Sequence, residues 1–234
     1  MPKKRSSQLG QRTNNNKCPR SRTHHTNGFK KMVGLSQTDK CRFCKTETES
    51  NSHLLSGCKK RLSEQLYTQQ HNKVCKVIHW HICKNFNIPV PENSWKHELR
   101  AIIENKDVML TYDLMIPLSM NIENKALRPD IVLRNKKERT ALLIEISVPS
   151  DFCFNNAEIK KMTKYQELKN EITRSWKLMS VKIAPVIIGA TGVIKKNLTE
   201  ILVTIVGNIT TNELQLEAVR GSMMILKRAL GTKL

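Results

Sequence analysis

The sequence lacks any long apolar run: none of its 234 residues lies in a stretch approaching the roughly 20 apolar residues that span a bilayer. Its start, Met-Pro-Lys-Lys-Arg, lacks the apolar core of a secretory signal. No internal repeat and no polymerase motif is visible. These absences exclude a membrane-spanning or repeat protein. They predict a soluble, intracellular chain with no membrane partner.

Disulfide bonds are not expected, although the chain contains seven cysteines. Seven is an odd number, and Cys75, Cys83 and Cys153 lie in apolar-periodic or strand-flanking segments rather than in loops suited to disulfides. The cysteine pattern therefore predicts a reducing compartment.

Positive charge dominates the composition, with 40 Lys and Arg against 20 Asp and Glu and a net charge of +20. A surplus of this size favours a polyphosphate partner, which predicts binding to DNA and to RNA. Composition alone fits a ribosomal or chromatin-type basic protein equally well. The decision between a binding protein and an enzyme must come from the motifs.

Three regions follow from the composition along the chain. Residues 1–35 carry nine Lys and Arg and no acidic residue, which predicts a disordered basic arm. Lys3, Lys4 and Arg5 in this arm resemble a nuclear import signal, so we expect nuclear localisation. Residues 36–60 form a small cysteine-containing module. Residues 61–234 have room for one domain of ordinary size, with helical elements at both ends.

Hydrophobic periodicity predicts an α/β domain. Apolar residues recur at helical spacing over 59–86, and strands are expected over 107–117, 128–134 and 140–148. A helix over about 155–178 and a strand over 181–188 follow, and two further helices are expected from 194 to 205 and from 212 to 230. His79 and His81 lie on the first helix, where we interpret them as packing or surface residues rather than as a second metal site.

The small module has the spacing of a zinc knuckle. Cys41, Cys44, His53 and Cys58 form a C-x2-C-x8-H-x4-C pattern, in which a tight turn directs the first two thiolates to one Zn2+. A segment this short buries little apolar surface, so metal coordination would provide most of its folding free energy. Zinc knuckles commonly contact single-stranded or irregular nucleic acid, although a protein-binding finger has the same pattern.

Two carboxylates lie in or beside apolar strands. Asp130 opens one strand in Arg-Pro-Asp, and Glu145 stands inside Leu-Leu-Ile-Glu-Ile of the next. A buried carboxylate is costly unless it is paired or metal-bound. If the two strands are neighbours, the acids meet, and their oxygens suit Mg2+ or Mn2+.

These motifs, in this order, resemble the carboxyl-terminal region of non-LTR retrotransposon reverse transcriptase polyproteins. The resemblance covers roughly residues 38–205. It rests on the knuckle, on Arg-Pro-Asp at 128–130, on Ile-Glu-Ile-Ser-Val-Pro at 144–149 and on Lys-Met-Thr-Lys-Tyr-Gln-Glu-Leu at 161–168. It implies a restriction-endonuclease-like PD-(D/E)xK fold, a mixed sheet flanked by helices. It also implies that Asp130 and Glu145 bind the catalytic metal. In the resembled family a reverse transcriptase region precedes the knuckle in a longer parent protein, and the sequence leaves open whether this chain is a captured gene, a decayed element or a truncated gene model.

The catalytic lysine is expected from a helix. Position 147 is Ser where the general nuclease pattern has Lys, and in the resembled family a lysine of the following helix substitutes for it. At about 100° per residue, Lys161 falls within about 40° of the centre of that helix's apolar face, and Lys164 about 100° away. We therefore expect Lys161 to face the two acids and Lys164 to contact phosphate. Glu158 and Asp113 are lesser candidates for a supporting role.

The sequence thus predicts a metal-dependent DNA endonuclease that hydrolyses phosphodiester bonds and binds its target through the knuckle and the basic arm. The alternative is a catalytically inactive nucleic-acid-binding protein derived from the same element. A structural or protein-interaction module is a third possibility, and it conflicts with the charge surplus. Target sequence, strand preference and oligomeric state are left open.

Overall fold

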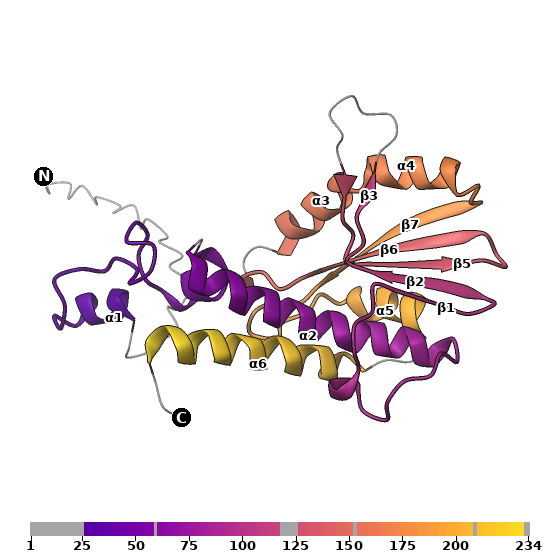
Figure 1. Ribbon diagram of the computed structural model, residues 1–234. Helices are drawn as coiled ribbons and strands as arrows, with labels where there is room; N and C mark the ends of the chain where they lie inside the picture. The colour runs from indigo at the N-terminus through magenta and orange to yellow at the C-terminus, as the bar shows by residue number, and fades with distance from the viewer. Residues whose placement is uncertain (1–25, 59, 118–125, 152–153, 208–209, 232–234) are drawn as a thin grey trace, which may run out of the picture.

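The computed structural model describes residues 26–58, 60–117, 126–151, 154–207 and 210–231, and its centre is a five-stranded mixed sheet (Figure 1). The strand order is β1-β2-β5-β6-β7, with β6 and β7 parallel and the other neighbours antiparallel. The strands are β1 (Ile102–Glu104), β2 (Val108–Tyr112), β5 (Ile131–Asn135), β6 (Thr140–Ser147) and β7 (Ser180–Ile187). A separate antiparallel pair joins β3 (Ile116–Pro117) to β4 (Ala126–Leu127).

Helices cover both faces of this sheet. Figure 1 shows α3 and α4 on one face, and the long helices α2 and α6 side by side with α5 on the other. Their bounds are α2 (Arg61–Asn85), α3 (Phe154–Lys164), α4 (Gln166–Ser175), α5 (Leu198–Val206) and α6 (Thr211–Leu230). The expected mixed α/β class with helices flanking the sheet is therefore confirmed.

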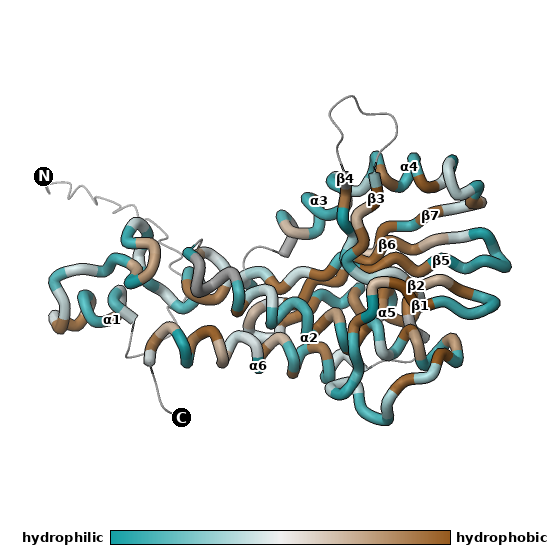
Figure 2. The backbone as a smooth tube through the Cα atoms, viewed as in Figure 1, coloured by the Kyte–Doolittle hydropathy of each residue, from teal (hydrophilic) through white to brown (hydrophobic). Residues whose placement is uncertain are grey.

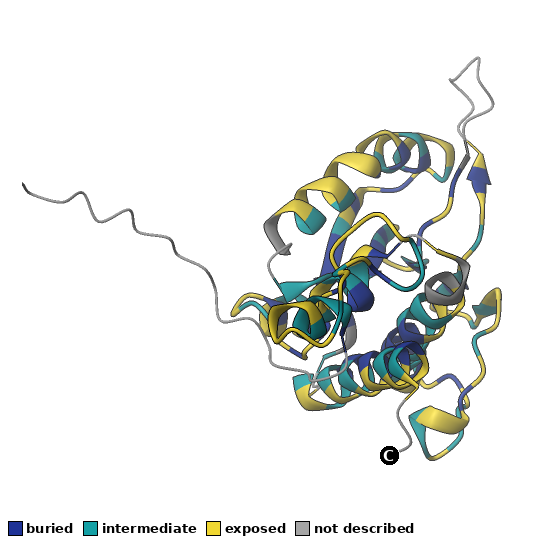
Figure 3. Cartoon of the chain, turned by 90° about the vertical axis from the view of Figure 1, so that its left-hand side faces the viewer, coloured by how far each residue is buried: buried dark blue, intermediate teal, exposed yellow. Residues whose placement is uncertain are grey.

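Alternation along the strands divides the core into two layers. In β6, Ile144 and Ile146 pack with the α2, α5 and α6 side, whereas Ala141 and Leu143 pack with α4. Figure 2 shows the middle of the sheet as apolar and its turns as hydrophilic, and Figure 3 shows buried residues between the layers. By the same alternation, Glu145 lies on the face covered by α3 and α4.

Two expected elements are divided in the structure. The expected helix over 155–178 is broken at Tyr165, a buried residue whose hydroxyl donates to the carbonyl oxygen of Arg128 at 2.8 Å. The expected strand over 107–117 splits into β2 and β3, because Asp113 adopts a φ of 53° that interrupts an extended chain. Strand β1 had no signal in the sequence strong enough to predict it.

Part of the expected disordered arm has a regular structure. Asn27–Met32 form helix α1, and Thr26 before it is buried. The backbone N–H of Asn27 donates to the carboxylate of Glu49 at 2.7 Å, which ties α1 to the knuckle. Residues 1–25, including the candidate import signal, lie outside the described residues.

Helices α2 and α6 approach closely at Gly221. A Cβ atom at that position would lie 2.3 Å from Cγ and 2.6 Å from Cβ of Gln70. The Gln70 amide nitrogen donates across this contact to the Ala218 carbonyl at 2.7 Å and to the Ser222 hydroxyl at 2.8 Å. A residue without a side chain is therefore required at this crossing.

Candidate functional site

The register of β5 and β6 brings the two predicted acids together. Ile131 pairs with Ile144, so Asp130 and Glu145 are the next residues on the two neighbouring strands. The backbone N–H of Asp130 donates to Glu145 Oε1 at 3.1 Å, and that of Ile146 donates to Asp130 Oδ2 at 2.7 Å. Both carboxylates are therefore held in place by backbone N–H groups.

Lys161 lies over both acids. It comes from α3, and its Nζ is 2.7 Å from Glu145 Oε2 and 3.7 Å from Asp130 Oδ2. The structure thus places the cation on the helix after β6, as the helical phase predicted, rather than at Ser147. Burial alone would lower the pKa of Lys161, but the charges of Asp130 and Glu145 raise it, so Lys161 keeps its proton.

The two acids differ in their environment. The Glu145 side chain is fully buried, and burial together with the neighbouring charge of Asp130 raises its pKa. Burial would also raise the pKa of Asp130, but a hydrogen bond from His71 and the charges of His71 and Lys161 lower it. Asp130 is therefore the carboxylate that stays ionised most readily, and its side chain is 16% exposed.

His71 is a further member of this cluster, which the sequence does not predict. It lies on α2, and its Nε2 is 3.2 Å from Asp130 Oδ2. Burial by itself lowers the pKa of His71, but hydrogen bonds with Asp130 and Cys75 raise it to about 11, which makes it a cation at neutral pH. The sequence gives no local signal for this contact, because it depends on how α2 crosses the end of the sheet.

The remaining candidates, Lys164, Asp113 and Glu158, have other direct partners in the structure. Lys164 is exposed and its Nζ donates to the Tyr165 hydroxyl at 2.7 Å. Asp113 is held by Arg128, whose guanidinium donates to its carboxylate at 2.7 Å and to its carbonyl at 2.8 Å. Glu158 forms an ion pair with Lys195. Lys164 is linked to Glu145 indirectly, because the Tyr165 hydroxyl that it contacts also forms a hydrogen bond with Glu145. The contacts of Asp113 and Glu158 do not bring them to the two acids.

A second cluster contains the four residues of the knuckle pattern. The ligand atoms of Cys41, Cys44, His53 and Cys58 all lie within 4.8 Å of one another, so the group can hold a metal ion. Cys41 Sγ and Cys58 Sγ are 3.8 Å apart, and Cys44 Sγ is 3.4 Å from His53 Nε2. Tetrahedral zinc would separate such pairs by roughly 3.8 and 3.6 Å. The cluster is therefore compatible with structural zinc.

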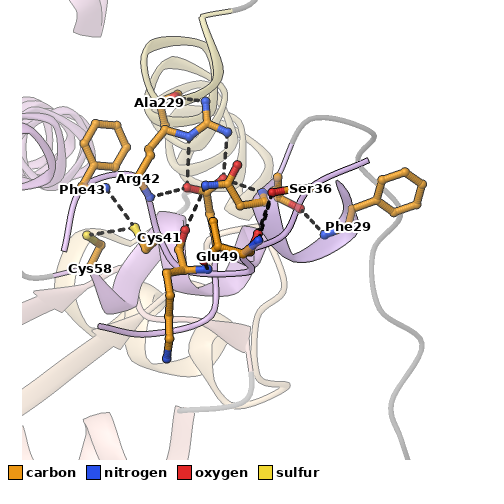
Figure 4. A network of polar contacts seen from close by, with 12 residues as sticks. Phe29, Ser36, Cys41, Arg42, Phe43, Glu49, Cys58 and Ala229 are labelled. Atoms are coloured by element: carbon orange, nitrogen blue, oxygen red, sulfur yellow. Dashed lines mark hydrogen bonds and ion pairs between the residues drawn. The ribbon is translucent and has the colours of Figure 1, made fainter. Parts of the chain in front are cut away.

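Buried charge supports the turn that carries these ligands. Glu49 is fully buried and forms an ion pair with Arg42 at 2.8 Å, and the backbone N–H of Arg42 donates to the same carboxylate at 2.7 Å (Figure 4). Burial would raise the pKa of Glu49, but the hydrogen bonds from Arg42 and Asn27 lower it. Glu49 thus stays ionised and joins the turn to α1.

The knuckle is attached to the sheet-containing part of the chain at several points. Arg42 donates to the carbonyl of Ala229 at the end of α6 at 3.0 Å (Figure 4), and Tyr67 on α2 donates to the carbonyl of Leu54 at 2.7 Å. Ser52 Oγ lies 2.7 Å from Oγ of Ser150, in the segment that follows β6. The knuckle therefore lies next to the loop that leads from Glu145 to α3.

Comparison with known proteins adds no family assignment. No known protein-family model matches the chain, and no curated protein matches it either. Among the described residues, none of the helices is long and apolar enough to cross a membrane. The two side-chain clusters are therefore the features from which a function can be inferred.

Proposed function

We propose that this chain is a metal-dependent endonuclease that hydrolyses phosphodiester bonds in DNA, with a restriction-endonuclease-like fold. The observation that carries the proposal is the meeting of Asp130, Glu145 and Lys161 at adjoining ends of β5 and β6. The order of elements supports it as well: helix α2 precedes the antiparallel strands, and α3 and α4 precede the parallel strand β7.

The acids fit a divalent cation of the Mg2+ or Mn2+ type. Such cations prefer carboxylate and water oxygens, and oxygens of both acids already lie within 3.7 Å of one positively charged atom, Lys161 Nζ. Asp130 and Glu145 would hold the cation. When bound, the cation polarises phosphoryl oxygens and lowers the pKa of an attacking water.

The protein side chains have separate tasks in this reaction. Lys161 presents a positive charge beside the acids, where it stabilises negative charge that develops on the phosphate. His71 and the N–H of Ile146 both bind Asp130 Oδ2 and fix the orientation of this carboxylate. Lys164 lies one turn along from Lys161, on the exposed side of α3, where it would contact a neighbouring phosphate.

Nucleic-acid binding in this proposal comes from the knuckle and from the general charge. Zinc held by Cys41, Cys44, His53 and Cys58 would keep the knuckle folded beside the segment after β6. The net charge of +20 favours a polyanionic partner, DNA and in addition RNA. Nuclear localisation and descent from a retrotransposon polyprotein with a reverse transcriptase region remain predictions of the sequence.

A second candidate function is nucleic-acid binding without cleavage. Ser147 replaces the lysine of the general pattern, and Lys161 satisfies Glu145 by an ion pair that needs no metal. A protein that had lost activity could keep this ion pair as a structural element. The two functions differ in whether phosphodiester bonds are cut, so cleavage decides between them.

The deciding experiment incubates zinc-loaded protein with supercoiled plasmid and Mg2+ or Mn2+. Asp130→Asn and Glu145→Gln should bind plasmid as the parent does but fail to nick it, because each removes a carboxylate from the cluster. Glu138→Gln, which changes an exposed carboxylate in the turn between β5 and β6, should nick normally. A parent that binds the plasmid and leaves it intact with both metals would favour the binding protein.

A further inference from the structure

The described residues contain another cluster of metal-ligand side chains, distant in sequence from the knuckle and the acids. It consists of His79 and Cys83 on α2 and of His97, directly after the short 3-10 helix η2 (Ser94–Lys96). His79 and Cys83 are fully buried and His97 is 4% exposed. One ligand atom from each residue lies within 4.8 Å of the others.

The geometry of these atoms is close to that of a metal site. His79 and Cys83 are four residues apart on one helix face, and Cys83 Sγ lies 3.5 Å from His79 Nδ1. Tetrahedral zinc separates a thiolate and an imidazole nitrogen by roughly 3.6 Å and two imidazole nitrogens by roughly 3.3 Å. His97 Nε2 is 2.7 Å from His79 Nδ1, so these two rings must move apart by roughly 0.6 Å to share an ion.

The chemistry of the three side chains also suits a metal ligand set. Imidazole nitrogens and a cysteine sulfur are ligands that zinc accepts. Metal binding would form a metal–sulfur bond as the thiol proton leaves to solvent.

The hydrogen bonding of His79 leaves a polar atom unexplained. Its Nε2 is buried and has no hydrogen-bond partner among the residues that the structure describes. His79 Nδ1 faces both Cys83 and His97, so it is the ring atom that would bind a metal, and the ring proton would then be on Nε2.

Although the sequence indicates a packing or surface role for His79, we propose that His79, Cys83 and His97 bind a second zinc ion. Nitrogen and sulfur donors select zinc over the oxygen-seeking Mg2+ and Mn2+. The ion fastens the segment between α2 and β1 to the helix, a segment also held by the Trp80 indole, which donates to the Pro91 carbonyl at 2.8 Å. This site does not depend on the proposed endonuclease activity.

Zinc content per chain tests the proposal after purification in reductant and removal of loosely bound metal. The parent should carry two equivalents, and Cys83→Ser and His97→Gln should each carry one. Cys44→Ser should also carry one, because it removes a knuckle ligand. His81→Gln is the matched control on the same helix and should keep two. A parent with one equivalent, or two equivalents in both cluster variants, overturns the proposal.

Substitution with Co2+ distinguishes the two sites by their ligands. The knuckle has three thiolates and the second site has one, so the second site should give a weaker thiolate-to-metal absorption band. In the Cys44→Ser background this weak band should remain, and further change of His97→Gln should remove it. The His97 variant leaves α2 unaltered, and its circular dichroism spectrum reports on folding. A band that survives in the double variant contradicts the assignment.

Discussion

Lys161 is the residue whose charge the proposed reaction needs most directly. Its Nζ lies 2.7 Å from Glu145, so its loss should affect cleavage directly. Binding should change little, because Lys161 is only one of 40 Lys and Arg residues that attract the nucleic acid. We expect Lys161→Met to slow nicking by about 100-fold or more, as for other removed charge-stabilising groups. Nicking rates and gel-shift affinities measure the two effects. Lys160→Met, an exposed neighbour on α3, is the control and should cut normally.

The same substitution should lower stability, since it leaves Glu145 buried without its partner. Breaking a buried ion pair on one side costs about 3 kcal/mol or more. The double variant Lys161→Met with Glu145→Gln removes both charges and should regain most of that loss while still failing to cut. Urea unfolding of the single and double variants separates stability from catalysis. Equal stability of the two would show that the pair contributes little to folding.

His71 should act through Asp130 rather than on the substrate. Its imidazole holds Asp130 Oδ2 at 3.2 Å, and loss of such a supporting contact typically reduces metal affinity or activity by about 10- to 100-fold. We expect His71→Gln to cut slowly at low Mg2+ and to recover in part as Mg2+ is raised. The rate as a function of Mg2+ concentration is the measurement. A defect that Mg2+ does not change would assign His71 to folding alone.

Among the elements, the crossing of α2 and α6 is the most sensitive to size. Alanine favours a helix over glycine by roughly 1 kcal/mol, but a Cβ at Gly221 would lie 2.3 Å from Cγ of Gln70. Overpacking costs about 1–3 kcal/mol, so we expect Gly221→Ala to destabilise the protein. Met223→Ala, an exposed change on the same helix, should have a much smaller effect. Thermal unfolding compares them, and a more stable Gly221→Ala protein would contradict the close approach.

The junction of α2, η2 and α6 should depend on pH through Glu213. Burial would raise its pKa, but hydrogen bonds from Ser94 and His81 lower it below the usual value of about 4.3. A lowered folded pKa means that the stabilisation is present above about pH 4.3 and is lost as pH falls through the folded pKa. The stability difference between parent and Glu213→Gln should therefore be under about 1 kcal/mol at pH 7 and vanish once the pH is below the folded pKa. A difference that persists in acid would exclude this carboxylate as its source.

The elements that could be predicted from sequence are those whose periodicity and burial agree. The buried apolar run of β6 and the apolar face of α2 predicted the bounds of this strand and this helix to within a few residues. The helical phase of Lys161 predicted that its side chain points toward the two acids. His71 could not be predicted, because its contact with Asp130 is set by tertiary packing. The expected helix breaks at Tyr165, whose hydroxyl contacts the carbonyl of Arg128, 37 residues away. A local sequence pattern predicts neither contact, because each joins residues that are far apart in the chain.

At the scale of the whole molecule, helix α6 connects the knuckle to the part of the chain that contains the sheet. Leu226, Ala229 and Leu230 pack against the knuckle residues Cys41 and Leu54, and Arg42 donates to the Ala229 carbonyl. Since metal coordination provides most of the folding free energy of so small a module, a chelator should unfold it and release the end of α6. Hydrogen exchange should then rise over residues 224–230 and in the knuckle, while β5 and β6 stay protected.

Cys44→Ser should reproduce this exchange pattern without a chelator, and Ser56→Ala, in the same module but outside the ligand set, should not. The positions of Asp130 and Glu145 depend on the β5 and β6 register and not on the knuckle. The Cys44→Ser protein should therefore still cut short oligonucleotides, although slowly. Plasmid binding should weaken instead. If α6 keeps its protection when the knuckle unfolds, the contact at Ala229 does not couple the two parts, and the knuckle acts only as a separate binding module.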